Sequence, residues 1–288
     1  MKLKDVSKGT ISISFHHGIS NQKELNIGRI KAMERKEPKS VIKSINDISA
    51  TDIEEMHHIF IKYYNHTDLD TFTRDIRKKQ YVLLISHPAS GIIVGFTTIA
   101  IINLKYKRKN VLGLFSGDTI LEKEFWGSRR WQLTWAWFCL KLKVMNFRSP
   151  FFWLLISKGY KTYLLMANNF NRYYPRLDSE DEQLADIVDL YCEQLFPAQY
   201  IKELRILDFG DQYQSLQSHV AEISPDLREA QPKIKYFEEL NPDWRRGTEL
   251  PCVGVINIAL IISFAKKVIA EKFRISGTVF ASNKLHTR

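Results

Sequence analysis

Three consecutive strand-like segments in the middle of the chain restrict the fold more than any other feature of the sequence. Residues 80–86, 92–104 and 111–121 are rich in β-branched and aromatic side chains, as strands are. A cluster of Pro, Ser and Gly separates the first two, and a basic turn separates the second from the third. Connections this short join antiparallel neighbours. The sequence therefore predicts a three-stranded antiparallel meander, with Gly113 and Gly117 as candidate β-bulges in its last strand.

Helices are predicted on both sides of this meander, together with one further strand. Residues 49–65 and 68–79 carry apolar side chains at helical spacing. After the meander, residues 129–147 are apolar nearly all round, and such a helix must be covered on more than one face. Residues 151–156 form a wholly apolar run typical of a central strand, and 162–171 form another helix. This order predicts an α/β (α+β) fold with a mixed, mostly antiparallel central sheet flanked by helices.

The pattern divides the chain into three parts. Residues 1–38 are basic and lack a clean period, so we expect a loosely ordered lead-in. Residues 39–176 contain the elements above and form the predicted central domain. Residues 177–288 are predicted to be a C-terminal extension packed on this core as an added helical layer. The extension contains a predicted helix at 179–195 opened by a Ser179–Glu182 capping box, a helix at 225–240, a strand at 250–256 and an amphipathic helix at 258–273.

Charge is unevenly distributed along the chain, whose formal net charge is +10. Residues 105–176 contain fourteen Lys or Arg and three Asp or Glu, a net of +11. Residues 177–251 contain seven and seventeen, a net of −10. A basic block of this kind favours an anionic partner on one face, such as a phosphorylated cofactor, an acidic carrier protein, a nucleic acid or an anionic lipid. A solvated surface explains part of the same charge.

Targeting and redox features favour a cytoplasmic protein. The first residues lack the apolar stretch of a secretory signal. The apolar run 252–265 is shorter than the about 20 residues that span a bilayer, which leaves peripheral membrane contact open. Cys139, Cys192 and Cys252 are far apart and form no CxxC pair, which suits a reducing compartment. The histidines lack an HExxH motif or a cysteine partner, so we expect no metal site.

The turn after the third strand is the strongest candidate binding site. A helix that begins there presents free backbone N–H groups and its positive dipole end, which suit a phosphate group. Residues 118–130, Asp-Thr-Ile-Leu-Glu-Lys-Glu-Phe-Trp-Gly-Ser-Arg-Arg, resemble strand four and the pyrophosphate loop of the GNAT superfamily of acyl-CoA-dependent N-acyltransferases. The aromatic residues and the central glycine of that loop are kept as Phe125, Trp126 and Gly127. The two later glycine positions fall on Arg129 and Trp131.

The resemblance implies a thioester co-substrate, either acyl-CoA or an acyl carrier protein. It also implies that the end of the third strand and the following loop bind it. Where the loop glycines are missing, arginine side chains and the helix dipole are expected to hold the phosphates. The predicted cofactor-binding residues are Ile120, Leu121, Trp126, Gly127, Ser128, Arg129 and Arg130.

A second stretch, residues 152–175, resembles strand five of the family and the helix that follows it. Many members have Asn-x-x-Ala-x-x-Leu-Tyr there, and the tyrosine protonates the leaving thiolate. In this chain Tyr163 falls on the Asn position and Phe170 on the Tyr position. Tyr163, Tyr173 and Tyr174 are the candidates to act as the acid instead, and we prefer Tyr163 because it lies nearest the end of the strand. The alternative is that these tyrosines pack under the extension. Residues 158–163 also resemble a divergent branch of the family that carries a C-terminal extension, similar to N-acyl amino acid synthases. This resemblance implies an acidic acyl carrier protein as a further partner.

The implied reaction is direct attack of a small-molecule amine on the thioester. A backbone N–H of strand four would polarise the thioester carbonyl. Asp118 or a water molecule would accept the amine proton, with Glu122 and Glu124 as further candidate bases. The predicted catalytic residues are therefore Asp118, Tyr163 and Glu122.

Two other functions stay open. The missing loop glycines and the missing tyrosine favour a catalytically inactive binding or sensor protein of the same fold. Nucleic-acid binding ranks lowest, because the basic residues lie on no recognisable DNA- or RNA-binding module and the acidic block 177–251 opposes it.

Overall fold

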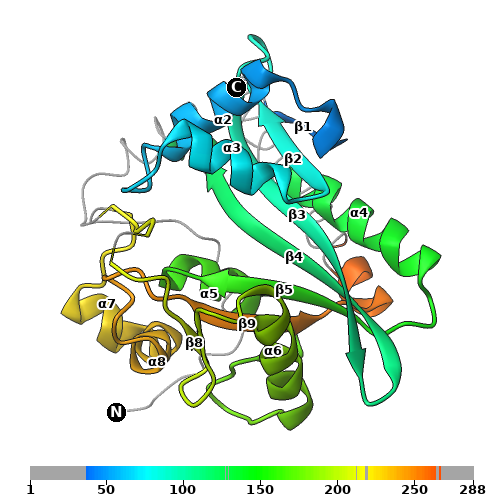
Figure 1. Cartoon of the computed structure of the whole chain (residues 1–288), viewed down its shortest axis with the longest axis vertical. Helices are drawn as coiled ribbons and strands as arrows, with labels where there is room; N and C mark the ends of the chain where they lie inside the picture. The colour runs from blue at the N-terminus through cyan, green and yellow to red at the C-terminus, as the bar shows by residue number, and fades with distance from the viewer. Residues whose placement is uncertain are drawn as a thin grey trace, which may run out of the picture.

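A seven-stranded sheet forms the centre of the protein (Figure 1). The structure is a computed structural model and describes residues 37–126, 128, 130–211, 213–217, 220–263 and 266. The strand order is β1-β2-β3-β4-β5-β9-β6, and within the described residues only β4 and β5 pair in parallel. The predicted mixed, mostly antiparallel sheet is confirmed. Its strands are β1 (Lys39–Ser44), β2 (Tyr81–Ser86), β3 (Ile93–Tyr106), β4 (Lys109–Leu121), β5 (Phe151–Ser157), β6 (Tyr173–Tyr174) and β9 (Leu250–Val255).

The meander predicted from the sequence is formed by β2, β3 and β4. Each strand pairs with the next in antiparallel register. Gly113 pairs regularly with Ile102, so it is not a bulge. The register of β3 and β4 shifts beside Gly117, as predicted for the other glycine. A separate two-stranded sheet consists of β7 (Tyr200–Ile201) and β8 (Ile206–Leu207).

Both faces of the central sheet are buried by helices. Along β2, Val82 and Leu84 point to one face, whereas Leu83 and Ile85 point to the other, because side chains alternate along a strand. The first face is covered by α2 (Ala50–Phe60), α3 (Leu69–Arg77) and α6 (Glu182–Leu195). The second is covered by α4 (Arg130–Met145), α5 (Tyr160–Ala167) and α8 (Pro232–Leu240), with α7 (Pro225–Ala230) beside α8.

Side-chain caps fix where these helices begin. The Ser49 hydroxyl accepts the Asp52 N–H and the Asp52 carboxylate accepts the Ser49 N–H, which makes the capping box of α2. At α6 the cap is Asp181, whose carboxylate accepts the N–H of Leu184. The predicted capping box of residues 179 and 182 is therefore wrong, because an equally good cap stands one residue before the helix.

The single helix predicted at 225–240 is two helices, α7 and α8. Gln231 between them has φ −130° and ψ 90°, an extended conformation. Proline lacks a backbone N–H and disfavours a helical residue before it, so Pro232 ends one helix and opens the next.

Residues 175–249 form an insertion between two paired strands. β6 pairs with β9, and β9 pairs with β5, so β9 lies inside the sheet. The predicted return of residues 250–256 as a strand is confirmed. The predicted division after residue 176 thus separates β6 from its partner, and residues 177–288 supply a central strand as well as helices packed on the sheet.

Candidate active site

A β-bulge interrupts β4 near its carboxyl end. Thr97 of β3 pairs with Thr119 of β4, and Ile99 pairs with Ser116. One residue separates these two pairs on β3 and two residues separate them on β4, so β4 has one extra residue there. Gly117 and Asp118 occupy the bulge. A Cβ atom on Gly117 would lie 2.5 Å from the hydroxyl oxygen of Thr98, so a larger residue does not fit without displacing that side chain. Bulges are common beside active sites because they re-aim a side chain, here that of Asp118.

β4 and β5 separate beyond this bulge. Their parallel pairing runs from Leu112 with Phe151 to Ser116 with Leu155 and stops there, whereas β4 continues to Leu121. Figure 1 shows the two strands diverging toward their carboxyl ends. We call the space between these ends the wedge. Among the described residues, no strand pairs with this edge of β4, so a ligand or another chain segment can bind its backbone groups.

Charged and aromatic side chains gather at the wedge. The Nζ atom of Lys158, which follows β5, lies 3.1 Å from Oε1 of Glu249, which precedes β9. Only 8% of Lys158 and 4% of Glu249 are exposed. Asp118 interacts electrostatically with both. The same Nζ atom lies 4.5 Å from the ring centre of Tyr213 and 5.4 Å from that of Tyr64. We call these five residues the wedge cluster.

Burial changes the acid strengths of the two carboxyl groups. It raises the pKa of Asp118, although Lys158 and Lys79 act in the opposite direction. It also raises the pKa of Glu249, against the effect of Lys158. A carboxylate with a raised pKa is a better base near neutral pH. The cluster therefore combines carboxylates that can accept a proton with an ammonium group that can donate one.

The two tyrosines of the cluster remain neutral at physiological pH. Burial raises the pKa of Tyr64 and Tyr213 well above the ordinary value, and the nearby Asp118 and Glu249 add to the effect. The face of a phenol ring attracts cations. An ammonium group entering this site would therefore meet both carboxylates and aromatic faces, which suits an amine substrate.

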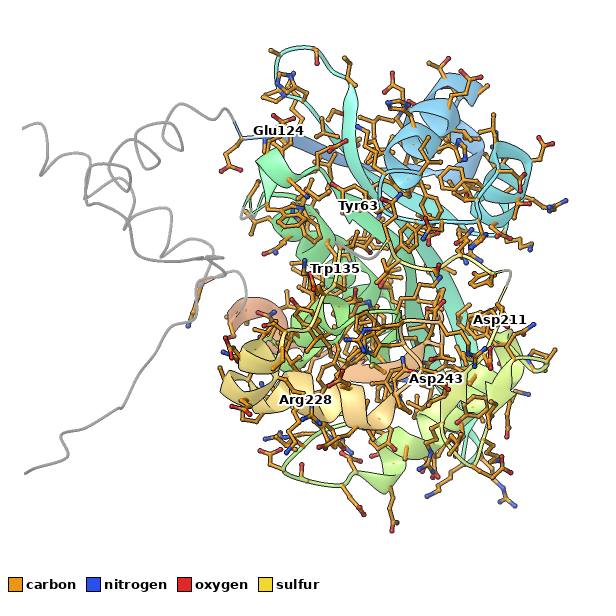
Figure 2. The ribbon with its side chains drawn as sticks, turned by 90° about the vertical axis from the view of Figure 1, so that its left-hand side faces the viewer. Tyr63, Glu124, Trp135, Asp211, Arg228 and Asp243 are labelled. Carbon is orange, nitrogen blue, oxygen red and sulfur yellow. The ribbon has the colours of Figure 1, made fainter. Side chains whose placement is uncertain are left out.

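The other two candidate bases lie outside the cluster. Oε1 of Glu122 is 2.6 Å from Nζ of Lys62, and both line a shallow surface depression with Tyr63. Glu124 is exposed, and Figure 2 shows it at the outer edge of the molecule, above Tyr63. Of the three predicted carboxylates, Asp118 is the one that the structure places with the Lys158–Glu249 pair.

Tyr163 lies in the core and not at the wedge. It is fully buried, and its hydroxyl donates a hydrogen bond to the Pro175 carbonyl oxygen at 3.2 Å. Its ring centre lies 5.9 Å from that of Phe237 on α8. Burial raises its pKa far above the ordinary value. This placement argues against Tyr163 as the proton donor, and the alternative, packing beneath the residues after 176, accounts for it.

The predicted cofactor-binding residues at the end of β4 contact other protein groups. The Leu121 carbonyl oxygen accepts hydrogen bonds from the Tyr63 hydroxyl at 3.3 Å and from the Trp126 indole N–H at 2.7 Å. The Ile120 side chain is buried beneath α2 and α3. A ligand on this edge of β4 would compete with these two hydrogen bonds.

The predicted loop residues are only partly described. The Ser128 hydroxyl donates a hydrogen bond to Oε2 of Glu37 at 2.6 Å. Arg130 begins α4, where the free N–H groups of the helix lie. Gly127 and Arg129 lie outside the described residues, as does the Arg130 side chain.

Part of the insertion fills the wedge. We call residues 213–217 and 220–223 the wedge segment. A Cβ atom on Gly159, at the start of α5, would lie 2.9 Å from Cδ1 of Leu216 and 3.0 Å from Cβ of Ala221. Ala221 and Ile223 are buried in the core beneath α4 and α5. Side chains of the wedge segment therefore occupy the space between the ends of β4 and β5.

Hydrogen bonds attach the wedge segment to both sides of this space. The Asn65 N–H donates to the Ser215 carbonyl oxygen at 2.9 Å, and the Gln217 N–H donates to the Tyr63 carbonyl oxygen at 3.0 Å. On the α5 side, Nζ of Lys161 donates to the Val220 carbonyl oxygen. A ligand in the wedge has to displace these contacts or bind beside them.

Sequence reasoning missed most of the wedge cluster. Lys158 directly follows a wholly apolar strand and Glu249 directly precedes another, and a charge at the end of such a strand is a usable signal. Tyr64 and Tyr213 gave none, because they reach the site from loops far apart in the sequence.

The sheet order and the pairing of its strands agree with the mixed, mostly antiparallel α/β fold predicted from the sequence. No protein-family profile matches the chain, and no curated protein sequence matches it. Solved structures with a similar fold include the GNAT family N-acetyltransferase YhbS from Escherichia coli in complex with CoA, at 7% identity and a TM-score of 0.31 over 42% of this chain and 63% of that chain.

Two further structures align over about half of this chain. An acetyltransferase from Trypanosoma brucei is 14% identical with a TM-score of 0.35, covering 50% of this chain and 99% of that chain. Glucosamine-6-phosphate N-acetyltransferase from Arabidopsis thaliana is 14% identical with a TM-score of 0.33, covering 49% and 98%. The alignment spans less than two thirds of the Escherichia coli protein. These likenesses concern the fold and assign no activity.

The described residues contain neither a cluster suited to a metal ion nor a helix suited to cross a membrane. Within them, no group of three or more His, Cys, Asp or Glu side chains is arranged to hold a metal ion. No helix in the same residues is long and apolar enough to cross a membrane.

Proposed function

We propose that this protein is an N-acyltransferase that moves an acyl group from a thioester to an amine. The observation that carries the proposal is the position of Asp118. It lies in the bulge of β4, where that strand leaves β5, beside a buried Lys158–Glu249 pair. A carboxylate whose pKa is raised by burial is suited to accept a proton from an ammonium group or an attacking amine.

The proposed reaction is one direct transfer. The amine nitrogen attacks the thioester carbonyl carbon, a C–N bond forms, the C–S bond breaks, and Asp118 accepts the amine proton. The Lys158 ammonium group donates a proton to the leaving thiolate, and Glu249 holds Lys158 in position. Lys158 thus takes the role that the sequence assigned to Tyr163.

The proposed donor is the thioester of acyl-CoA or of an acyl carrier protein. Residues 105–176 have a net charge of +11, which complements CoA phosphates or an acidic carrier protein. The start of α4 offers free N–H groups to a phosphate. The proposed acceptor is a small-molecule amine, because the carboxylates and tyrosine rings of the wedge cluster favour a cation.

A catalytically inactive binding protein is the second candidate. The wedge segment favours it, because Leu216 and Ala221 fill the space next to Gly159. The hydrogen bonds from Tyr63 and Trp126 to the Leu121 carbonyl oxygen favour it as well. Such a protein would bind a thioester or a partner without turning it over.

The test is thiol release with acetyl-CoA, long-chain acyl-CoA and acylated carrier protein, each offered with a panel of primary amines. Native mass spectrometry of the same mixtures reports binding. Asp118→Asn should slow release about 10²- to 10⁴-fold and keep binding, whereas the matched control Asp47→Asn, at an exposed position, should keep both. Binding without release in the parent protein favours the second candidate, and no binding of any donor contradicts both.

A further inference from the structure

The side of α4 that faces away from the sheet carries exposed apolar side chains. Trp137 is 71% exposed, Val144 62% and Leu133 37%. Their spacing of four and seven residues places them on one face of the helix. Met145 and Phe147, at the carboxyl end of the helix, are 68% and 67% exposed. Contiguous exposed apolar residues of this size usually mark a binding surface.

These exposed side chains do not take part in packing α4 on the sheet. The opposite side of α4 already packs on the sheet through the buried Cys139 and Leu142. Trp135 adds a ring contact to Trp153, with ring centres 5.1 Å apart. A helix that is apolar on all sides has to be covered on its outer side too. Figure 1 shows α4 along an outer edge of the molecule, so within the described residues its outer side faces away from the fold.

The same face is basic. Lys141 and Arg148 are exposed and continue the stripe of Leu133, Trp137 and Val144 at helical spacing. The guanidinium carbon of Arg148 lies 5.2 Å from the ring centre of Phe147. The sequence contains no Asp or Glu between Glu124 and Asp178. Aromatic and aliphatic side chains interleaved with cations, without acidic residues, are typical of a helix at the surface of an anionic bilayer.

We propose that this outer face of α4, made of Leu133, Trp137, Lys141, Val144, Met145, Phe147 and Arg148, docks on an anionic lipid bilayer. The apolar side chains insert between headgroups, and the two cations bind lipid phosphates. A purely acidic surface would match Lys141 and Arg148 but would leave the exposed Trp137 and Val144 without apolar cover. The bilayer surface satisfies both sets, and the proposal is independent of the acyl-transfer reaction.

Co-sedimentation of the full chain with vesicles tests this surface. Vesicles of phosphatidylcholine alone are compared with vesicles that also contain phosphatidylserine, at low and high salt. We expect binding to the anionic vesicles that weakens with salt. Trp137→Ser with Val144→Ser should weaken binding at least about tenfold through lost apolar burial. Lys141→Glu with Arg148→Glu should weaken it at least about fivefold for each cation lost.

Leu204→Ser is the matched control. Leu204 is 64% exposed and lies in the turn between β7 and β8, away from α4. This variant should bind vesicles like the parent protein, and circular dichroism should show that all variants stay folded. The proposal is overturned if the parent does not bind anionic vesicles, if the α4 variants bind as tightly as the control, or if the face binds an acidic carrier protein and not lipid.

Discussion

Asp118 is subject to opposite demands from stability and from chemistry. Burial raises its pKa, so between the ordinary pKa and the raised one the folded state binds more protons than the unfolded state. Stability therefore falls as pH rises through that window and stays lower above it. A neutral amide in this position avoids the cost of a partly desolvated charge, but it cannot accept a proton.

Asp118→Asn should therefore make the protein more stable at neutral pH and much slower as a transferase. We expect the gain in the free energy of unfolding to vanish at pH values below the ordinary aspartate pKa, where both side chains are neutral. The loss in kcat/KM should be about 10²- to 10⁴-fold, the usual contribution of a general base. Urea unfolding across pH, together with thiol release, measures both. If Asp118→Asn lowers the free energy of unfolding as well as kcat/KM, Asp118 has a structural role.

The Lys158–Glu249 pair makes a different prediction, because its two charges are buried together. Glu249→Gln leaves the Lys158 ammonium group without its ion partner, and breaking such a pair costs about 3–5 kcal/mol. Lys158→Met combined with Glu249→Gln removes both charges and should recover much of that loss. Urea unfolding of the two single variants and the double variant gives the coupling energy. If the loss of stability in the double variant equals the sum of the losses in the two single variants, Lys158 and Glu249 are not coupled.

The wedge segment connects secondary-structure elements and limits what can bind beside Gly159. Leu216 is half-buried against Gly159, and Ala221 lies beside it. If a donor binds only after the segment moves, only molecules with an open wedge can bind it. The apparent affinity is then the intrinsic affinity multiplied by the fraction of molecules in which the wedge is open. A change that weakens the segment should therefore strengthen donor binding.

Leu216→Ala tests this relation. We expect the variant to lose about 1–2 kcal/mol of stability, less than a fully buried leucine would. It should bind the acyl donor more tightly, by up to about tenfold for each 1.4 kcal/mol by which the closed state is weakened. Isothermal titration with the donor found by mass spectrometry measures the change. Leu204→Ala is the control, and unchanged or weaker binding by Leu216→Ala would show that the wedge segment does not oppose the donor.

The order of elements through β5 could be predicted because each has a local cause. The caps and apolar spacing of α2 and α3, the β-branched runs of β2 to β4 and the wholly apolar run of β5 are all visible in the sequence. The contacts of single side chains were harder to predict. Tyr163 has an apolar environment that only the packing of α8 reveals, and Glu249 meets Lys158 only because β9 returns to β5.

For the whole molecule, the main difference from the sequence prediction is topological. Residues 177–288 were expected to be an added layer, yet β9 lies between β5 and β6. Local sequence patterns do not show which strands a returning strand will pair with, because that depends on contacts between residues far apart in the chain. The site depends on the same return, since Glu249 and the wedge segment both come from the insertion.

This topology predicts how the protein responds to truncation. A chain ending at residue 176 loses β9, and β5 then becomes a sheet edge whose residues are apolar on both faces, as the burial of Trp153 and Leu154 shows. Exposed apolar edges pair with other chains, so we expect this fragment to be unfolded or aggregated. A chain ending at residue 266 keeps every described strand and should unfold near the temperature of the parent. Thermal unfolding by circular dichroism and size-exclusion chromatography compare the two. If the fragment ending at 176 folds as a monomer within a few degrees of the parent, β9 contributes little to the core, and the central domain is the independent unit that the sequence suggested.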